Sequence, residues 1–389
     1  QGTKLYSVLP SDGSGDFDYT RGSSATRINA QGLIESVTNT SSRLNYPLLD
    51  GKVVGCPHHL LESQSTNLLP YSEDFSNSVG WEPSGKPSAE SNVIISPDGT
   101  LNATRLSFGN NNTLRVKSEL TFTNAYSYSI FVKKDIGSFV TIFCAFFTTS
   151  ITVGFDLDNG TCQTGGVIEK YGNDWYRLSI SKNVSGDADR SGYFYLYSTQ
   201  EIGSTSSVSG NKLYVWGAQV EDSSFPTSYI KSNIGSATTR LGEAASGSGN
   251  AATFNDSEGV LMLEASALAD SDSLYRLISL KSSQSTYNDR IEFGFLNDGI
   301  YASIASNNSE KLSYNQSISD AKGFNKISLK YSNTSGCSIY LNGFELNTGS
   351  NTDFSANDFN GLEFKNHYGN KFYGNVKQVQ YFDTTDIDL

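Results

Sequence analysis

Three tyrosines occupy alternate positions in one stretch of the chain: Tyr193, Tyr195 and Tyr197. Alternate residues of a β-strand point to the same face, so the three phenol rings share one face while Phe194 and Leu196 share the other. Exposed phenols can stack on sugar rings, and their hydroxyls can form hydrogen bonds with the sugar. The spacing therefore predicts a carbohydrate-binding face; the alternative is that this face packs inward or lies under a loop. We expect the tyrosine face to be the more exposed one, because phenols tolerate water better than Phe and Leu side chains do.

A polar loop precedes these tyrosines. It contains Asp187, Asp189 and Arg190, which are expected to supply hydrogen bonds that orient a sugar ring stacked on tyrosine. The predicted carbohydrate-binding residues are Tyr193, Tyr195, Tyr197, Asp187, Asp189 and Arg190.

An acidic stretch near the start of the chain offers a candidate calcium site. It places carboxylates at Asp12, Asp16 and Asp18, and alternating oxygen ligands suit a hard cation such as calcium. The stretch lacks the Gly at the sixth position and the Glu at the twelfth, where Ser23 stands, that an EF-hand loop carries. An ordinary turn is the favoured alternative, and no other cofactor is expected.

The sequence carries no familiar catalytic motif. It has three histidines, His58, His59 and His367. Adjacent strand residues point to opposite faces, so His58 and His59 are poorly placed to share a metal ion, and a surface turn after Pro57 is expected there. There is no HExxH, no Gly-x-Ser-x-Gly and no phosphate-binding Gly-rich loop, and the acidic pairs are sequence neighbours rather than residues of one face. We therefore expect a protein that is not an enzyme.

The charge of the chain argues against nucleic acid as a partner. The 389 residues include 28 Lys plus Arg and 40 Asp plus Glu, which gives a net charge of −12. Such a surface repels nucleic-acid phosphate and anionic lipid. The longest apolar run, over 139–147, is far shorter than the roughly 20 residues of a membrane-spanning helix, so no membrane insertion is expected. Cys144 and Cys162 are expected to be buried free thiols rather than a disulfide.

Apolar and polar residues alternate along most of the chain, and helical periodicity is nearly absent. Turn signals such as Asn297-Asp298-Gly299 and Asn342-Gly343 separate the alternating runs, which predicts short antiparallel strands. The expected fold class is all-β, with two antiparallel β-sandwich or jelly-roll domains in tandem and an N-terminal lead segment. The expected parts are the lead segment over 1–64, a first sandwich over 65–231, a Gly/Ser/Ala-rich linker over 232–252 and a second sandwich over 253–389.

The three tryptophans, Trp81, Trp175 and Trp216, stand in strand-like contexts. An exposed indole is a good platform for a sugar ring, but core packing is the favoured interpretation here.

Several stretches resemble parts of tailed-bacteriophage virion proteins. The lead segment resembles a recurring N-terminal module through Ser24-Ala-Thr-Arg-Ile-Asn-Ala-Gln-Gly-Leu-Ile-Glu and Leu60-Leu-Glu-Ser-Gln-Ser-Thr-Asn. The first sandwich is similar to jelly-roll carbohydrate-binding modules through Asp174-Trp-Tyr-Arg-Leu-Ser and Val215-Trp-Gly-Ala-Gln-Val-Glu. The second sandwich resembles a concanavalin-A-like, laminin-G-type lectin domain through Ser338-Ile-Tyr-Leu-Asn-Gly. The resemblance implies that the tryptophans of these motifs support the fold, and it carries over no catalytic residue.

This resemblance implies a non-enzymatic structural protein of the virion, a fibre or an exposed decoration, assembled in the host cytoplasm and exposed on the particle surface. The implied partners are host-surface glycans and other virion proteins, and a homo-oligomer is expected, with a trimer as the leading assignment. Two alternatives stay open: an assembly module that binds no sugar, and an accessory module of a bacterial polysaccharide-degrading enzyme. The chain does not begin with Met, which suggests a portion of a longer virion chain or a processed one.

Overall fold

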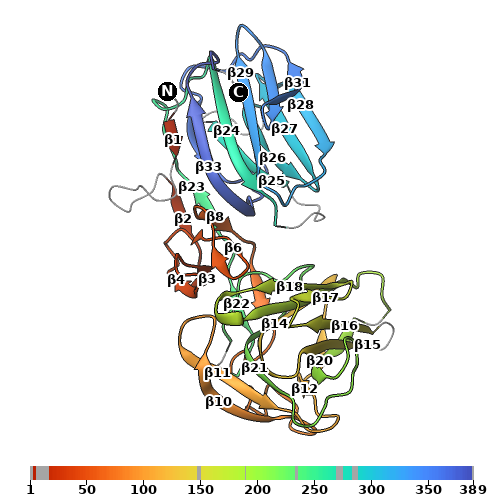
Figure 1. The fold of residues 1–389 in the computed structure, drawn as a ribbon. Helices are drawn as coiled ribbons and strands as arrows, with labels where there is room; N and C mark the ends of the chain where they lie inside the picture. The colour runs from red at the N-terminus through yellow and green to blue at the C-terminus, as the bar shows by residue number, and fades with distance from the viewer. Residues whose placement is uncertain are drawn as a thin grey trace.

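The fold is built almost wholly of β-strands. The computed structural model describes residues 3–5, 17–146, 150–188, 190–232, 235–268, 275–282 and 288–387. Within these ranges the one helical element is the 3₁₀ turn Gly172–Asp174, and the all-β class is confirmed. No helix in the described ranges is long and apolar enough to cross a membrane. Figure 1 shows two β-lobes with a smaller region between them, which is built from the N-terminal part of the chain.

The first lobe is a sandwich of two antiparallel sheets. One sheet has the order β10 (Ser88–Ile95), β11 (Leu101–Ser107), β21 (Lys212–Glu221), β14 (Ala125–Ile136), β19 (Tyr176–Asn183) and β18 (Gly166–Lys170). The other has the order β12 (Leu114–Arg115), β20 (Ser191–Thr199), β15 (Phe139–Phe146), β16 (Ile151–Asp156) and β17 (Thr161–Cys162), and β13 (Leu120–Thr121) also pairs with β20. Alternation buries one row of each sheet, so Ile130 and Val132 of β14 share the inter-sheet core with Phe194 and Leu196 of β20.

The second lobe is also a two-sheet sandwich. Its larger sheet has the order β31 (Phe344–Gly349), β30 (Cys337–Leu341), β29 (Asn325–Ser332), β24 (Glu258–Ser266), β33 (Gly374–Phe382), β8 (His58–Leu61) and β5 (Leu44–Asn45), and β1 (Thr3–Leu5) also pairs with β33. The smaller sheet has the order β28 (Ser309–Ser317), β27 (Gly299–Ser306), β26 (Arg290–Leu296), β25 (Tyr275–Ser282) and β32 (Phe359–Glu363). Both predicted hairpin turns are confirmed: Asn297 and Asn342 have φ of 54° and 51°, and Gly343 has φ of 87°.

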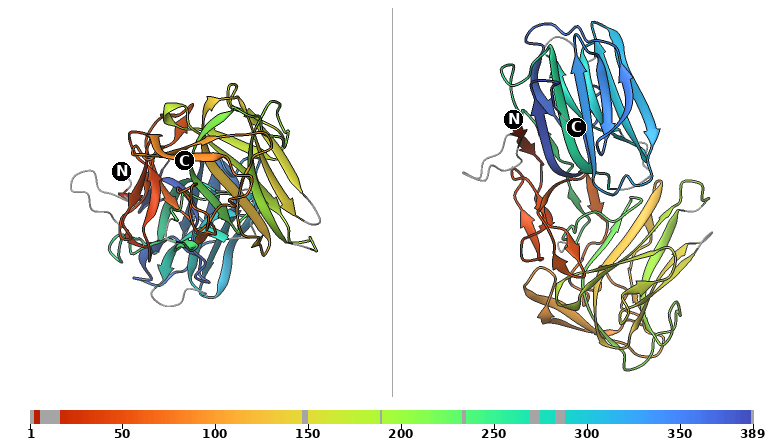
Figure 2. Two further views of the ribbon diagram at one scale, coloured as in Figure 1. Left: turned by 90° about the horizontal axis from the view of Figure 1, so that it is seen from below. Right: turned by 45° about the horizontal axis from the view of Figure 1, so that its top comes forward.

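The lead segment packs against both lobes. Its strands β8 and β5 extend the larger sheet of the second lobe beyond β33. Its hairpin of β3 (Ala25–Ile28) and β4 (Ile34–Val37) covers the outer face of the first lobe, where Ile34 joins a buried cluster with Phe131, Trp216 and Tyr229. A second small hairpin joins β6 (Leu48–Leu49) to β7 (Lys52–Val53). The right-hand view of Figure 2 shows this red segment wedged between the two lobes.

The segment expected to be a linker also forms strands. β22 (Thr238–Arg240) pairs with β9 (Ser65–Asn67), and β23 (Ala244–Ser246) pairs with β2 (Asp18–Thr20). The described part of 232–252 therefore differs from an open tether. Its small residues supply few apolar contacts, and buried charged side chains hold it in place instead.

Five of these charged residues, Arg21, Arg43, Glu62, Arg240 and Glu243, form what we call the junction network. Glu243 lies 2.5 Å from Arg21 Nη1, and Arg43 Nη1 lies 2.8 Å from Glu62 Oε2. Arg43 also donates from Nε to Glu243 Oε1 over 2.9 Å, and Arg240 Nη2 lies 3.5 Å from Glu62 Oε2. All five side chains are buried. Ion pairs with little access to water therefore join the lead segment, the end of β8 and the segment around β22.

Candidate functional site

The tyrosine face lies on the outer side of the first sandwich. β20 points Tyr193, Tyr195 and Tyr197 outward, where each is half-buried, while Phe194 and Leu196 are 1% and 0% exposed in the inter-sheet core. The expected orientation of this strand is therefore confirmed. This orientation follows from the alternation of apolar and phenol side chains along β20. Phe194 and Leu196 pack against the second sheet, whereas no sheet covers the phenol rings.

Neighbouring rings make this face a continuous aromatic surface. The Tyr195 and Tyr197 rings are nearly parallel, at 11°, with centroids 6.2 Å apart. On the adjacent strand β15, Phe143 is paired with Tyr195, and their ring centroids are 5.5 Å apart. The sheet fixes the spacing of these rings, so little side-chain freedom remains to be lost when a ligand binds.

An arginine that the sequence analysis missed lies over the tyrosines. Arg115 on β12 is the register partner of Tyr195, and its guanidinium carbon is 5.0 Å from the Tyr193 ring centroid and 5.9 Å from that of Tyr195. Its Nη2 is 2.7 Å from a carboxylate oxygen of Glu82. Both charged side chains are half-buried, so a hydrogen-bonding pair stands at the side of the aromatic surface. No local signal marks Arg115, because β12 has two residues and its partner strand lies far along the chain.

The Tyr197 hydroxyl remains a hydrogen-bond donor near neutral pH. Burial raises the pKa of Tyr197, and the hydrogen bond with Thr113, which lowers it, is the smaller effect. A neutral phenol can both donate to and accept from a sugar hydroxyl.

The polar loop before β20, expected to orient a bound sugar, makes contacts within the protein. Arg190 donates to the carbonyl oxygens of Thr123 and Ser185, and Asp187 lies 3.1 Å from Lys182 Nζ. These contacts hold the loop against its neighbours, and Arg115 is the charged group that stands over the tyrosine rings. Asp189 lies outside the described residues.

The candidate calcium site at Asp12, Asp16 and Asp18 lies largely outside the described part of the chain. Asp12 and Asp16 lie outside it, while Asp18 is exposed on β2, opposite Ser246. Among the described residues, no group of three or more His, Cys, Asp or Glu side chains is arranged to hold a metal ion.

The histidine pair is buried in a strand, which corrects the expected surface turn. His58 and His59 both lie on β8, and each is less than a tenth exposed. As adjacent strand residues they do face different neighbours: the His58 ring packs on Phe324, and His59 Nδ1 is hydrogen-bonded to the Ser42 hydroxyl. The sequence-based expectation failed because the pairing of β8 with the distant strand β33 has no local signature.

The tryptophans and Cys144 are buried as expected, whereas Cys162 is less buried than expected. Trp81, Trp175 and Trp216 are at most 1% exposed, so all three are core residues. Cys144 is a buried free thiol and Cys162 a half-buried one.

Comparisons with known proteins give distant fold similarities. No protein-family model matches the sequence, and no curated protein matches it either. The CBM40 of the Ruminococcus gnavus IT-sialidase, bound to alpha2,3 sialyllactose, is 11% identical with a TM-score of 0.29, and the match covers 34% of this chain and 80% of that one. The NanB sialidase of Streptococcus pneumoniae (K499G mutant) is 14% identical with a TM-score of 0.29, over 36% of this chain and 24% of that one. Domain 4 of AbnA, a GH43 extracellular arabinanase from Geobacillus stearothermophilus in complex with arabinotriose, is 12% identical with a TM-score of 0.28, over 38% and 70%. These values are too low to carry an argument about function.

Proposed function

We propose that this protein is a non-enzymatic structural protein of a bacteriophage virion, a fibre or an exposed decoration, which binds host-surface glycans through the tyrosine face. The observation that carries the glycan binding is the row of half-buried phenols on a sheet, with Arg115 and Glu82 at its side. The virion role is supported by the motifs in the lead segment and both sandwiches that resemble phage virion proteins.

The chemistry of the tyrosine face suits a saccharide. A pyranose ring has apolar C–H faces and a rim of hydroxyls, so it pairs with an aromatic ring that has polar groups beside it. Here the phenol hydroxyls, the Arg115 guanidinium and the Glu82 carboxylate are the polar groups, and the rings of Tyr195, Tyr197 and Phe143 are the apolar surface. An open face of this kind makes few contacts with each sugar, so single-site affinity is expected to be weak.

The test is the substitution Tyr195→Ala. We expect a loss of about 1 kcal/mol, or roughly fivefold in affinity, for glycans captured on an array and for adsorption to host cells, because the central ring of the surface is removed. The thermal unfolding midpoint should change little, since the ring lies outside the inter-sheet core. Tyr368→Ala is the matched control, because Tyr368 is a tyrosine of the second lobe that is 67% exposed.

Two results would contradict the proposal. Binding that is unchanged in a folded Tyr193→Ala/Tyr195→Ala double variant would remove the tyrosine face from glycan recognition. Release of reducing sugar from candidate polysaccharides by the wild-type protein would contradict the non-enzymatic assignment.

A further inference from the structure

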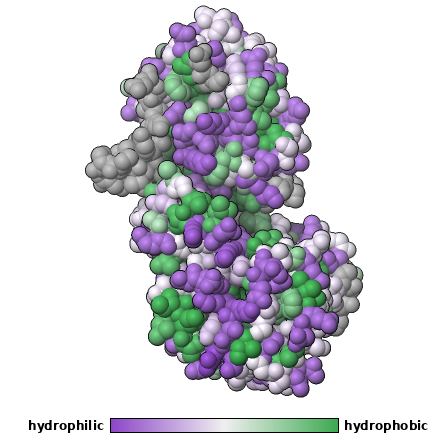
Figure 3. Space-filling view, in the orientation of Figure 1, coloured by the Kyte–Doolittle hydropathy of each residue, from purple (hydrophilic) through white to green (hydrophobic). Residues whose placement is uncertain are grey.

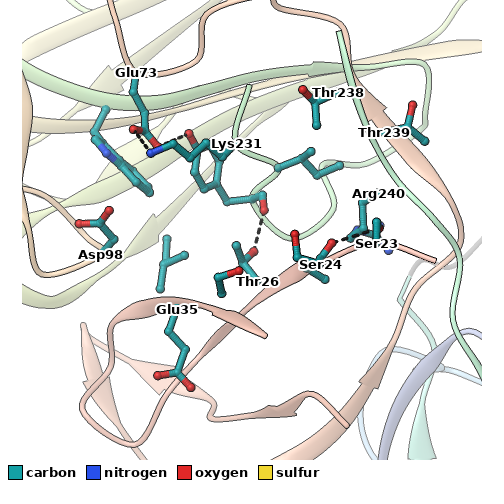
Figure 4. Close-up of a pocket in the computed structure, with 16 residues that line it drawn as sticks. Ser23, Ser24, Thr26, Glu35, Glu73, Asp98, Lys231, Thr238, Thr239 and Arg240 are labelled. Carbon is teal, nitrogen blue, oxygen red and sulfur yellow. Dashed lines mark hydrogen bonds and ion pairs between the residues drawn. The ribbon is translucent and has the colours of Figure 1, made fainter. Parts of the chain in front are cut away.

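A cavity lies on the opposite sheet of the first sandwich from the tyrosine face. It has a volume of about 510 Å³ and opens between the β3–β4 hairpin of the lead segment and the outer face of the β10–β18 sheet. This volume falls in the range of small-ligand pockets, roughly 300–1,000 Å³. Figure 4 shows its lining, which comes from the lead segment, the first sandwich and the β22 region.

Arg240, one of the lining residues, is a buried cation that lacks hydrogen-bond acceptors. It is 1% exposed, and within the described part of the chain its Nε, Nη1 and Nη2 atoms have no hydrogen-bond partner. It forms an ion pair with Glu62, whose Oε2 lies 3.5 Å from Nη2, but this contact is not a hydrogen bond. Buried N–H groups in proteins are nearly always hydrogen-bonded, so the Arg240 guanidinium is short of acceptors.

The junction network also carries one more positive charge than negative charge. Its three guanidiniums, those of Arg21, Arg43 and Arg240, face the two carboxylates of Glu62 and Glu243. Arg21 and Arg43 donate hydrogen bonds to these carboxylates, and Arg240 does not. Burial lowers the pKa of Arg21, and although Glu243 raises it, repulsion from Arg43 and Arg240 lowers it as well. An anion beside Arg240 would balance the charge of the network.

Two further buried charges leave this count unchanged. Glu221 accepts a hydrogen bond from the Thr227 hydroxyl over 2.6 Å, and Arg177 donates to the Thr227 carbonyl oxygen over 2.8 Å. Because one is negative and the other positive, the excess of one guanidinium remains.

The carboxylates of the cavity, in contrast, all have partners. Glu35 lies 2.5 Å from Arg27 Nη2, and Glu73 accepts a hydrogen bond from Lys231 Nζ over 2.8 Å. Asp98 accepts hydrogen bonds from the side chains of three neighbouring residues. The unmet requirement of the lining is therefore for an acceptor that carries negative charge.

The base of the cavity holds a second donor without a partner. Trp216 Nε1 is buried and has no hydrogen-bond partner among the described residues. The Trp216 and Tyr229 ring centroids are 4.5 Å apart, and Ile34 belongs to the same buried cluster. An indole N–H, like a guanidinium, can only donate. The lining therefore suits a ligand that has oxygen acceptors on a body able to lie against an apolar base.

We propose that this cavity binds a small molecule through a single carboxylate, which the Arg240 guanidinium holds. A planar carboxylate matches the planar fork of guanidinium donors, and its one negative charge balances the one unmatched guanidinium. A dianion such as sulfate would be repelled more strongly than a monoanion by Glu73 and Asp98, which Figure 4 shows at the opposite end of the cavity from Arg240. The site uses no residue of the tyrosine face, so the inference goes beyond the proposed glycan binding.

The test is isothermal titration calorimetry of the full chain with two matched pairs of probes. Benzoate is paired with benzamide, and glucuronate with glucose, so that each pair compares a carboxylate with a neutral counterpart. We expect at least one of the two acids to bind, and to bind about tenfold or more above its neutral counterpart in affinity, because only the acid offers Arg240 a charged acceptor. The tighter of the two acids shows whether the body of the ligand is an apolar ring or a sugar.

Four variants assign the binding to the cavity. Arg240→Gln should weaken the binding of that acid by about tenfold or more, and it leaves two guanidiniums facing two carboxylates in the junction network. Ser24→Trp, at an exposed position of the lining, should weaken it as much by filling the cavity. Arg115→Gln removes the cation of the tyrosine face, and Ser335→Trp adds an indole at an exposed turn of the second lobe, so these two controls should bind the acid like the wild type. The unfolding midpoint of each variant establishes that it is folded.

The outcomes separate this inference from the proposed function. Acid binding that survives Arg240→Gln in a folded protein, or Ser24→Trp where Arg240→Gln does not fold, overturns the cavity as a carboxylate site. So does acid binding that is lost in Arg115→Gln, neutral probes that bind as tightly as the acids, or a wild-type protein that binds neither acid. Glycan capture on an array is read separately: it should fall in Tyr195→Ala and stay unchanged in Arg240→Gln, so that either proposal can fail while the other stands.

Discussion

At the scale of single residues, the most unusual electrostatics lie in the junction network and the histidines beside it. Burial is the largest influence on the pKa of His59 and lowers it from 6.5 to about 3, and burial likewise lowers the pKa of His58 to about 4. For Glu62, burial acts to raise the pKa, but the nearby Arg240 and Arg43 outweigh it and the pKa falls to about 2. Each of these groups is thus held in the less protonated form, neutral for histidine and anionic for glutamate.

This arrangement predicts progressive destabilisation in acid. Between pH 6.5 and about 3 the unfolded chain takes up protons at His59 and His58 that the folded chain resists, and Glu62 extends the effect from about pH 4.5 to 2. Stability therefore falls as the pH falls, by up to about 1.4 kcal/mol per pH unit for each group. Urea unfolding between pH 4 and 7 measures this slope, and His59→Gln should make it shallower because the amide does not titrate. An identical slope in wild type and variant would show that His59 is not the group responsible.

The tyrosine face shows how far residue-level prediction reaches. Alternation along one strand was enough to orient Tyr193, Tyr195 and Tyr197, because the periodicity of a strand is local information. The role of Arg115 could not be predicted from the sequence. Its position over these rings depends on the register between β12 and β20, which are separated by a long stretch of chain. The cavity of about 510 Å³ that is lined by Thr26, Trp216 and Thr238 could not be predicted either, because its walls come from three separate parts of the sequence.

At the scale of elements, β8 is the clearest case of a strand that belongs to a distant part of the molecule. Leu61 lies on β8 and is 1% exposed, within the core of the second lobe. We predict that Leu61→Ala destabilises the second lobe by about 2–5 kcal/mol, through lost burial and the cavity left behind. Hydrogen exchange of β33 and β24, followed by mass spectrometry, should accelerate.

Leu49→Ala is the control from the same segment, because Leu49 is 64% exposed, and its effect should stay within about 0.5 kcal/mol. If Leu61→Ala leaves the exchange of β33 unchanged, the lead segment does not support that lobe.

The same strand marks the limit of element-level prediction. Hairpins could be predicted from dipeptides such as Asn342-Gly343, because a tight hairpin turn needs residues that tolerate positive φ. The four residues of β8 are all buried and show no alternation, and β5 and β12 have two residues each, too few for any period to be visible. The segment 232–252 has the composition of a tether, yet β22 and β23 form there because charged partners elsewhere in the chain pair with its Arg240 and Glu243.

At the scale of the whole molecule, an exposed apolar patch is a candidate contact between copies of the protein. Figure 3 shows a largely hydrophilic face with a green apolar patch near β10 and β11, strands on which Ile95 and Leu101 are 50% and 61% exposed. Because β10 is also an edge strand, this region is a natural contact for a second copy. We predict a closed homo-oligomer by light scattering, with a trimer as the leading assignment, and a shift toward the monomer in Leu101→Lys. Val167→Lys, on the opposite edge strand β18 and at a residue 55% exposed, should leave the mass unchanged. A strictly monomeric wild-type protein would refute the expectation.

The position of β33 also dictates an order of assembly during synthesis. This strand lies near the end of the chain, yet it pairs with β24 and with both β8 and β1 from the beginning. The two sheets of the first sandwich draw all their strands from 88–221, so that lobe can close while the ribosome is still translating the second one. Within this sequence the lead segment is translated before β33, so β8 lacks that partner strand until the last strand of the second lobe has been made. The pairing of β8 with β33 therefore forms after the first lobe can already fold, and the apolar side chains of β8 need shielding throughout that delay.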